Sequence, residues 1–301
     1  MKQPEPGPNL WGGLNNPILE PREADVVILG LPFDRAVSSR RGAASAPDRI
    51  RELSIHIPPT TEEGKSLNKL RFRDLGNLSP VKLNQAAYFE LVEQKAAELF
   101  KTTFPTFIGG DHSVTIPLLN AAADLWGRDL GVIHLDAHLD LCDTLDGNPY
   151  SHGCTQRRFL EKNNLPPGQV YYIGIRSFEL QELTFLEGRW AGIFTAAEIS
   201  RQGIKTVAEK VCSGLKECKA IYLTIDIDFL DPAAAPGTGT PKPGGFTTRD
   251  LFLFLHHFSM LPVIGMDIVE VSPPLDHNDI TSFAAQRIIT ESWGLFLPGL
   301  K

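Results

Sequence analysis

The chain has 301 residues, of which 42% are hydrophobic and 22% are charged, a composition typical of a protein that buries a substantial core. Its formal net charge of -7, without any block of Lys and Arg, argues against binding to the phosphate backbone of nucleic acids. No segment offers the roughly 18 uninterrupted apolar residues of a membrane-spanning helix, and the first residues lack the apolar core of a secretory signal. We therefore expect a cytoplasmic protein without nucleic-acid or membrane partners.

The chain is predicted to form one α/β domain behind a short arm. Residues 1–20 begin with a proline-rich stretch and are assigned to an N-terminal arm, and residues 21–301 to a single domain. Runs with the length and β-branched content of buried strands occupy residues 26–31, 105–108, 130–135, 170–175, 220–225 and 263–269. Helical spacing occurs between them, at residues 84–100, 114–125, 204–215, 248–258 and 280–295. This alternation predicts a three-layer α/β/α fold with a mostly parallel central sheet.

Potential metal ligands stand where three of these predicted strands end. A Gly109-Gly110 pair, which permits a tight turn, precedes the first of them. Asp136, His138 and Asp140 alternate along the chain, so an extended backbone projects them to the same side. Asp226 and Asp228 repeat this spacing. In parallel sheets, ligands bind outside the carboxyl ends of the strands, which places all of these residues in one site. The candidate ligands are His112, Asp136, His138, Asp140, Asp226 and Asp228.

Four carboxylates and two imidazoles suit Mn²⁺ and can also hold Ni²⁺, Co²⁺, Fe²⁺ or Zn²⁺. Four aspartates in one cleft would repel one another, and two divalent ions would offset their charge. We therefore expect two divalent metal ions, with Mn²⁺ as the first choice. His134 shares the strand side of the ligands, but we interpret it as a packing or supporting residue. Asp111 is expected to cap the helix that follows it or to orient the site.

In order along the chain, these motifs resemble those of the ureohydrolases, the family that includes arginase, agmatinase and guanidinobutyrase. The resemblance spans most of the chain and implies an arginase-like catalytic domain over residues 21–301. It also implies assembly into homo-oligomers, either trimers or hexamers. The further motifs that carry the resemblance are Tyr150-Ser151-His152-Gly153, Gly174-Ile175-Arg176-Ser177, Pro236-Gly237-Thr238-Gly239-Thr240-Pro241 and the run from Gly265 to Pro273.

The resemblance implies a role for each site residue. One ion would be held by His112, Asp136, Asp140 and Asp226, and the other by Asp136, His138, Asp226 and Asp228, so that Asp136 and Asp226 bridge. Metal coordination lowers the pKa of water from about 15.7 to about 7 and so provides a nucleophile for the guanidinium carbon. His152 and Asp140 would then handle the proton that the leaving amine needs. Glu270 would accept paired hydrogen bonds from the guanidinium group.

The substrate is expected to be a linear guanidino compound. Arginase-like sequences carry Asn where this chain has Cys142, and a Ser-Gly-Asn loop where it has residues 143–150, which weighs against arginine. The motifs are more similar to those of agmatinase, so we expect hydrolysis of agmatine to putrescine and urea, a step of polyamine biosynthesis. Candidate partners for the agmatine amine are Asp143, Asp146, Glu179 and Glu182. Leu139 replaces the Thr of many relatives and would alter the surroundings of the metals.

Three alternatives remain open at this point. Within the same chemistry, the substrate is a guanidino acid such as 4-guanidinobutyrate or 3-guanidinopropionate, or free guanidine, and a basic residue in the pocket would favour the acid. A metal-dependent deacetylase would need a single zinc site, and the paired Asp226 and Asp228 with His112 argue against it. A non-catalytic paralogue would be expected to lose ligands, whereas this sequence retains them all.

Overall fold

A computed structural model describes residues 6–163, 165, 168–187 and 192–297 of the chain. Residues 1–5 of the predicted N-terminal arm and residues 298–301 of the predicted domain lie outside this description. The strands are β1 (Val26–Gly30), β2 (Phe72–Asn77), β3 (Phe104–Ile108), β4 (Leu130–Leu135), β5 (Val170–Ile175), β6 (Ile193–Thr195), β7 (Ala220–Asp226) and β8 (Val263–Val269). The α-helices are α1 (Leu10–Gly13), α2 (Ala46–Ser54), α3 (Gln85–Leu99), α4 (Thr115–Trp126), α5 (Thr155–Asn163), α6 (Leu180–Phe185), α7 (Ala196–Gln202), α8 (Ile204–Leu215), α9 (Thr248–Phe258) and α10 (Ile280–Phe296). Three short 3-10 turns matter for the site: η3 (His112–Val114), η5 (His152–Cys154) and η6 (Ile227–Phe229).

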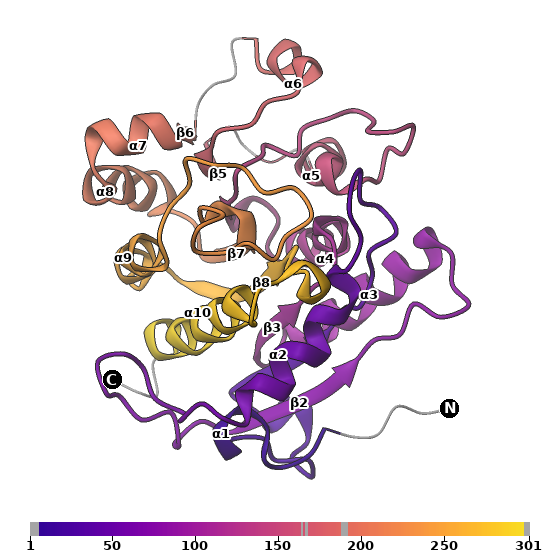
Figure 1. Cartoon of the computed structure of the whole chain (residues 1–301), viewed down its shortest axis with the longest axis vertical. Helices are drawn as coiled ribbons and strands as arrows, with labels where there is room; N and C mark the ends of the chain where they lie inside the picture. Colours follow the sequence, from indigo (N-terminus) through magenta and orange to yellow (C-terminus); the bar gives the residue numbers. More distant parts are fainter. Residues whose placement is uncertain (1–5, 164, 166–167, 188–191, 298–301) are drawn as a thin grey trace.

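The strands form one eight-stranded sheet in the order β2-β1-β3-β8-β7-β4-β5-β6. Every pair of neighbouring strands is parallel. Helices α2, α8, α9 and α10 cover one face of the sheet, and α3, α4 and α5 cover the other (Figure 1). Each face has its own buried apolar core, so the predicted three-layer α/β/α fold with a parallel sheet is confirmed.

The sequence predicted the six inner strands and missed the two at the edges of the sheet. β2 is half polar, with Arg73, Asp74 and Asn77 among its residues, and β6 is only three residues long. Edge strands are covered less completely than central ones, so neither carries the apolar run that identified the others. The helices α1, α2, α5, α6 and α7 were also missed, because none of them is longer than 9 residues.

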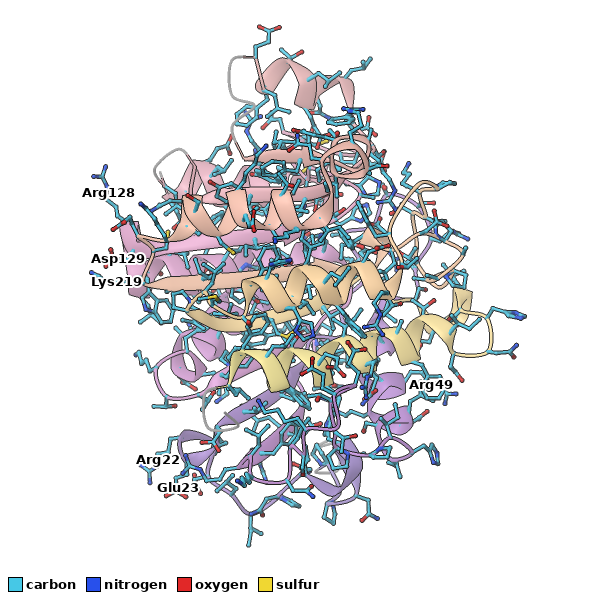
Figure 2. The ribbon with its side chains drawn as sticks, turned by 90° about the vertical axis from the view of Figure 1, so that its left-hand side faces the viewer. Arg22, Glu23, Arg49, Arg128, Asp129 and Lys219 are labelled. Atoms are coloured by element: carbon cyan, nitrogen blue, oxygen red, sulfur yellow. The ribbon has the colours of Figure 1, made fainter. Side chains whose placement is uncertain are left out.

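All eight strands point the same way, so their carboxyl ends lie along one edge of the sheet. The opposite edge, which carries the amino ends of the strands, is marked in Figure 2 by the labels of Asp129 and Lys219. These two residues precede β4 and β7 and form an ion pair of 2.7 Å. Arg22 and Glu23, just before β1, lie on that same side, whereas Arg49 of α2 lies on the other (Figure 2). The predicted ligands follow β3, β4 and β7, and Glu270 follows β8. These four strands are neighbours in the centre of the sheet, which brings the residues that follow them together.

The described part of the first 20 residues packs against the domain. Trp11 is 2% exposed, and its ring centroid lies 6.1 Å from that of Phe72 and 5.4 Å from that of Trp293. Its indole Nε1 donates a hydrogen bond of 2.8 Å to Asp74. This segment therefore stabilises the β2 edge of the sheet. Among the described residues, no helix has the length and apolar character needed to cross a membrane.

Candidate metal centre

A close backbone approach positions the first predicted ligand, His112. A Cβ atom at Gly110 would lie 1.7 Å from the carbonyl oxygen of Phe33, so only glycine fits there. Asp111 caps η3, because its Oδ1 accepts a hydrogen bond of 3.1 Å from the backbone N of Ser113. The tight turn and the cap expected from the sequence are both present, and together they fix the direction of His112.

His112 lies against three of the predicted carboxylate ligands. Its Nδ1 is 3.0 Å from Oδ2 of Asp136, 3.0 Å from Oδ2 of Asp140 and 3.3 Å from Oδ2 of Asp226. Asp136 and Asp140 follow β4, and Asp226 ends β7. All four side chains are buried. The ends of three strands thus place an imidazole and three carboxylates around one point.

His138 and Asp228 complete the cluster on the other side of Asp136. The Nδ1 atom of His138 is 3.0 Å from Oδ2 of Asp228 and 3.4 Å from Oδ1 of Asp136. Asp136 therefore faces His112 with Oδ2 and His138 with Oδ1. The His138 side chain is 25% exposed and lines the cavity described below. The structure thus brings all six predicted ligand residues into one cluster with Asp136 at its centre.

Several atoms of this cluster are buried without a hydrogen-bond partner among the described residues. They are Nδ1 of His112 and the Oδ2 atoms of Asp136, Asp140 and Asp228. Their short separations do not have the geometry of hydrogen bonds, and an unsatisfied buried polar atom typically costs about 1–3 kcal/mol. Converging imidazole nitrogens and carboxylate oxygens are a donor set that suits divalent transition metals. The residues present therefore fit a metal centre.

The charges within the cluster favour the same conclusion. Burial and the neighbouring charges of Asp228 and Asp136 raise the pKa of Asp226 well above its ordinary value. Burial lowers the pKa of His112, but the surrounding carboxylates, Asp140 first, outweigh it and raise that pKa well above its ordinary value. The cluster thus favours positive charge at its centre. Metal ions can provide that charge in place of protons.

A chain of hydrogen bonds behind His112 orients its ring. Thr224 donates its hydroxyl proton to Oδ1 of Asp267 at 2.6 Å and therefore accepts from Nε2 of His112, which lies 2.9 Å away. This leaves the Nδ1 lone pair of neutral His112 pointing at the carboxylates. Tyr222 and Thr115 also donate to Asp267, at 2.8 and 3.0 Å. Asp267 thus orients His112 through Thr224, a residue that the sequence patterns did not single out.

His134 supports the cluster from behind. Its ring stacks on that of His112, with centroids 5.1 Å apart and an angle of 7° between the planes. Its Nδ1 lies 3.1 Å from the amide nitrogen of Gln156, and its Nε2 lies 3.0 Å from the carbonyl oxygen of His138. Its Nε2 is also 3.2 Å from Oδ2 of Asp136, so His112, His134 and Asp136 form a group of potential ligands. Because both ring nitrogens already have protein partners, we favour a supporting role for His134.

His152 and Glu270 are joined to each other and to the cluster. Nδ1 of His152 is 2.9 Å from Oε1 of Glu270, and the same oxygen accepts a hydrogen bond of 2.9 Å from the backbone N of His112. Burial lowers the pKa of His152, but the charge of Glu270 outweighs it and raises that pKa to about 9. Oε2 of Glu270 makes no hydrogen bond within the described part of the chain.

Two of the predicted site residues adopt strained backbone conformations. Asp140 has φ 57° and Glu270 has φ 61°, both in the left-handed region that side chains other than glycine rarely occupy. Such strain persists only where the surrounding structure imposes it, and it gathers at functional sites. The backbone N atoms of Gln156 and Arg157 hold the carbonyl oxygen of Asp140, at 3.0 and 3.1 Å. These backbone conformations set the directions in which the two carboxylates point.

The cluster opens into a small cavity of about 100 Å³. Of the four acids predicted to meet an amine, Glu179 and Glu182 line this cavity, whereas Asp143 is exposed and paired with Arg158 at 2.8 Å. Asp146, the fourth, does not line the cavity. The Glu182 oxygens already accept hydrogen bonds from the backbone N atoms of Leu141 and Glu179, at 2.9 and 2.8 Å. Glu179 is therefore the acid best placed to meet a ligand.

Lys242, which the sequence analysis did not single out, also lines the cavity. Arg176 donates a hydrogen bond of 2.7 Å to its carbonyl oxygen and thereby fixes its backbone. Within the described residues, the ammonium group of Lys242 has no hydrogen bond or ion pair. The sequence offered a signal, because Lys242 directly follows the Pro236 to Pro241 motif.

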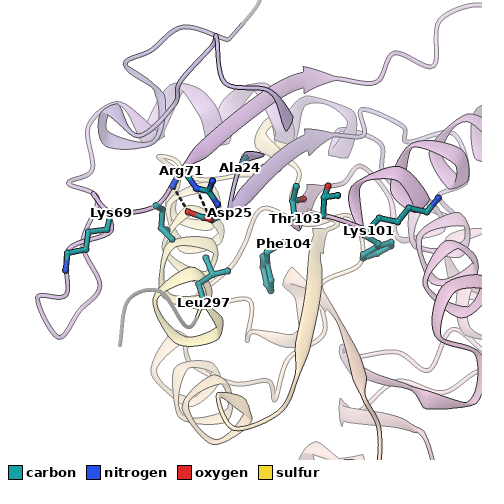
Figure 3. Close-up of a pocket in the computed structure, with 11 residues that line it drawn as sticks. Ala24, Asp25, Lys69, Arg71, Lys101, Thr103, Phe104 and Leu297 are labelled. Carbon is teal, nitrogen blue, oxygen red and sulfur yellow. Dashed lines mark hydrogen bonds and ion pairs between the residues drawn. The ribbon is translucent and has the colours of Figure 1, made fainter. Parts of the chain in front are cut away.

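A larger cavity, of about 390 Å³, lies at the opposite edge of the sheet, beside the amino ends of β1 and β3. Figure 3 shows Arg71 and Asp25 paired across it, with Lys69 and Lys101 on opposite sides. Among the described residues that line it, there is neither a histidine nor a second carboxylate. This cavity therefore lacks the donors of a metal centre, although it is the more spacious of the two.

Comparison with known proteins gives concordant results. The model of the arginase family matches residues 24–294. The chain is 35% identical to proclavaminate amidinohydrolase of Streptomyces clavuligerus over 279 residues, covering 90% of this chain and 88% of that protein. It is also 35% identical to the agmatinase of Bacillus subtilis (strain 168) over 273 residues, covering 89% and 91% of the two chains. The solved structure of the Streptomyces clavuligerus enzyme superposes with a TM-score of 0.86 at 32% identity, covering 98% of this chain and 97% of the other.

Proposed function

Because this chain belongs to the arginase family of amidinohydrolases, we propose that it hydrolyses a linear guanidino compound to urea and an amine, with agmatine as the substrate. The observation that carries the proposal is the convergence of two imidazoles and four carboxylates at the ends of the central strands, with several buried atoms left unsatisfied. The family resemblance expected from the sequence motifs is confirmed.

We assign the six clustered residues to two divalent metal ions, with Mn²⁺ as the first choice and Ni²⁺ or Co²⁺ as alternatives. One ion would be held by His112, Asp136, Asp140 and Asp226. The other would be held by Asp136, His138, Asp226 and Asp228. When bound, the ions supply a water of lowered pKa and polarise the substrate.

The remaining residues position the substrate and move the proton. Glu270 presents its free Oε2 to the guanidinium group and holds His152 through Oε1. Asp140, next to His112 and on the cavity wall, accepts the proton that the nucleophile releases. His152 is the source of the proton that the leaving nitrogen takes up as its bond to the guanidinium carbon breaks, so that the amine departs in a stable form.

Recognition of the agmatine amine is assigned to Glu179. This residue lines the cavity and is exposed, whereas Glu182 is 3% exposed and both of its oxygens accept from backbone N atoms. The similarity to agmatinases supports this assignment.

A guanidino acid is the second candidate, and Lys242 is the observation that favours it. An unpaired ammonium group on the cavity wall would attract a substrate that carries a carboxylate at the end opposite its guanidinium group. The equally similar proclavaminate amidinohydrolase is consistent with a substrate other than agmatine.

Urea release by the purified protein tests both candidates. The protein would be reconstituted separately with Mn²⁺ and Ni²⁺ and supplied with agmatine, arginine, 4-guanidinobutyrate, 3-guanidinopropionate or guanidine. We expect preference for agmatine. Preference for a guanidino acid would leave the proposed hydrolysis unchanged. It would indicate that Lys242, and not Glu179, binds the end of the substrate opposite the guanidinium group. No urea from any compound in a fully metallated sample would refute the proposed function.

A further inference from the structure

The 34–42 loop, which lies between β1 and α2, connects three segments of the site. The backbone N of Ala36 donates to Oδ2 of Asp111 at 2.9 Å, and its carbonyl oxygen accepts from the backbone N of His152 at 3.0 Å. Arg40 donates to the carbonyl oxygens of Gly239 and Thr238, at 3.0 and 3.1 Å. The loop is thus tied on both sides of Ser38, which lines the same cavity as His138 and Asp140.

Both ring nitrogens of His152 point at protein groups. Nδ1 points at Oε1 of Glu270, 2.9 Å away. Nε2 lies 3.1 Å from the backbone N of Ser38 and 2.9 Å from its Oγ. An imidazole nitrogen holds its proton or lone pair in one direction in the ring plane, and here both directions are occupied. Both ring nitrogens of His152 are therefore engaged by protein groups.

Of the described groups within hydrogen-bond distance of Nε2 of His152, the Ser38 hydroxyl is the one that can both accept and donate a proton. The backbone N–H of Ser38 can only donate, so it requires a lone pair on Nε2 and places the proton of neutral His152 on Nδ1, toward Glu270. When His152 is protonated, its Nε2–H needs an acceptor, and Oγ of Ser38 is the acceptor within reach.

We propose that Ser38 is a proton-relay residue, whose hydroxyl carries the proton from Nε2 of His152 to the leaving amine. In this step the N–H bond at Nε2 breaks and a new O–H bond forms at Ser38. The original hydroxyl proton of Ser38 passes to the amine nitrogen as the bond between that nitrogen and the guanidinium carbon breaks. Ser38 ends the step as a neutral hydroxyl, and His152 ends it as neutral imidazole. The inference rests on the proposed function.

Kinetics of three variants test the relay, with each protein loaded with Mn²⁺ and supplied with its best guanidino substrate. Ser38→Ala removes the hydroxyl and keeps the backbone N–H, so we expect kcat to fall about 10- to 100-fold, toward the low end of general acid–base effects because water can enter the vacated space. KM should stay close to that of the parent. Ser38→Thr restores a hydroxyl and should restore most of kcat. Ser39→Ala, at the exposed neighbouring serine, is the matched control and should leave kcat unchanged.

A second readout does not depend on catalysis. In protein that is labelled with ¹⁵N-histidine and kept free of metal, the His152 signals are those lost in His152→Asn. The charged groups facing this ring are Glu270, Asp111 and Asp140, and none of them is changed in the variants. Ser38→Ala removes the acceptor for Nε2–H, so the protonation midpoint of His152 should lie at lower pH than in the parent, Ser38→Thr and Ser39→Ala.

Parent-like kcat in Ser38→Ala would overturn the relay, as would a loss confined to KM or a Ser38→Thr variant as impaired as Ser38→Ala. An unchanged His152 midpoint in Ser38→Ala would also overturn it. If the parent released no urea at all, the proposed function would fail, while the ¹⁵N measurement would still decide whether the Ser38 hydroxyl stabilises protonated His152.

Discussion

The two edges of the central sheet both carry cavities with charged residues. At one edge the charges are paired and exposed to solvent, and at the other they are buried and only partly paired. At the amino-end edge, Asp25 accepts hydrogen bonds from the side chain and backbone N of Arg71, and Arg71 is mostly exposed. Burial raises the pKa of Asp25, but these bonds outweigh it and lower that pKa below its ordinary value. At the carboxyl-end edge, carboxylates and imidazoles are buried together, and several of their atoms have no partner.

The difference shows which features identify a catalytic cavity. The amino-end cavity has about 390 Å³ and the carboxyl-end cavity about 100 Å³, so size alone would not single out the cavity where the predicted ligands converge. An exposed ion pair such as Arg71–Asp25 contributes little to stability, and its charges are already satisfied without a bound ligand. A buried cluster of unsatisfied hydrogen-bond acceptors costs free energy of folding unless something binds to it. The predictions below test this contrast.

Asp136→Asn should have the largest effect, because Asp136 contacts both histidines of the cluster. Substitution of a residue that merely supports a metal ligand typically costs about 10- to 100-fold, so loss of this ligand should reduce urea release by more than about 100-fold. Metal content, measured by mass spectrometry after dialysis, should fall in parallel. Asp25→Asn is the matched control at the other edge and should retain the metal content and activity of the parent.

Thr224→Val should have the next largest effect. It removes the hydroxyl that joins His112 to Asp267 with little change in volume. We expect metal affinity, measured by calorimetric titration, to fall by about 10- to 100-fold. Thr224→Ser keeps the hydroxyl and should bind metal nearly as the parent does. Equal affinity in Thr224→Val and the parent would show that the orientation of His112 does not depend on this chain of hydrogen bonds.

Lys242→Glu should change substrate preference by a smaller factor. Reversing this charge should favour agmatine over 4-guanidinobutyrate in kcat/KM by about tenfold, because a partly exposed ion pair contributes up to about 1 kcal/mol for each interaction gained or lost. The measurement is the ratio of kcat/KM for the two compounds, with the neutral butylguanidine as the reference. An unchanged ratio would exclude Lys242 from the binding of the substrate tail.

Arg71→Ala should have the smallest effect. It breaks the ion pair with Asp25 at the amino-end cavity, where both groups reach solvent. Urea release should be unaltered and Tm almost so. A marked loss of activity would contradict the contrast between the two cavities, since it would show that the amino-end cavity also contributes to function.

The sequence predicted the clustered residues of the candidate site better than the residues that orient them, and the reason is physical. Ligands such as Asp136 and His138 follow apolar strands at fixed spacing, so the parallel sheet itself brings them together. Ser38 and Thr224 carry no such signal, because a hydroxyl in a loop or a buried strand resembles many others. Their roles depend on contacts with His152 and His112, from which they are separated by 114 and 112 residues.

The edges of the fold were less predictable than its centre for a related reason. β2 pairs with a single strand and contains Asp74, a buried carboxylate that accepts from Trp11 and Arg51. A buried polar network of this kind breaks the apolar pattern by which central strands are recognised. Similarly, the position of Lys242 after the Pro236 to Pro241 motif does not show that this residue lines the cavity, which only the folded loop reveals.

A metal titration with two simultaneous readouts tests the central claim most directly. Metal-free protein would be titrated with Mn²⁺, and bound metal and urea release would be measured in the same samples. We predict that urea release is absent without metal and reaches its plateau as the second ion per chain binds. A plateau at one ion per chain, or full urea release from metal-free protein, would contradict the binuclear assignment.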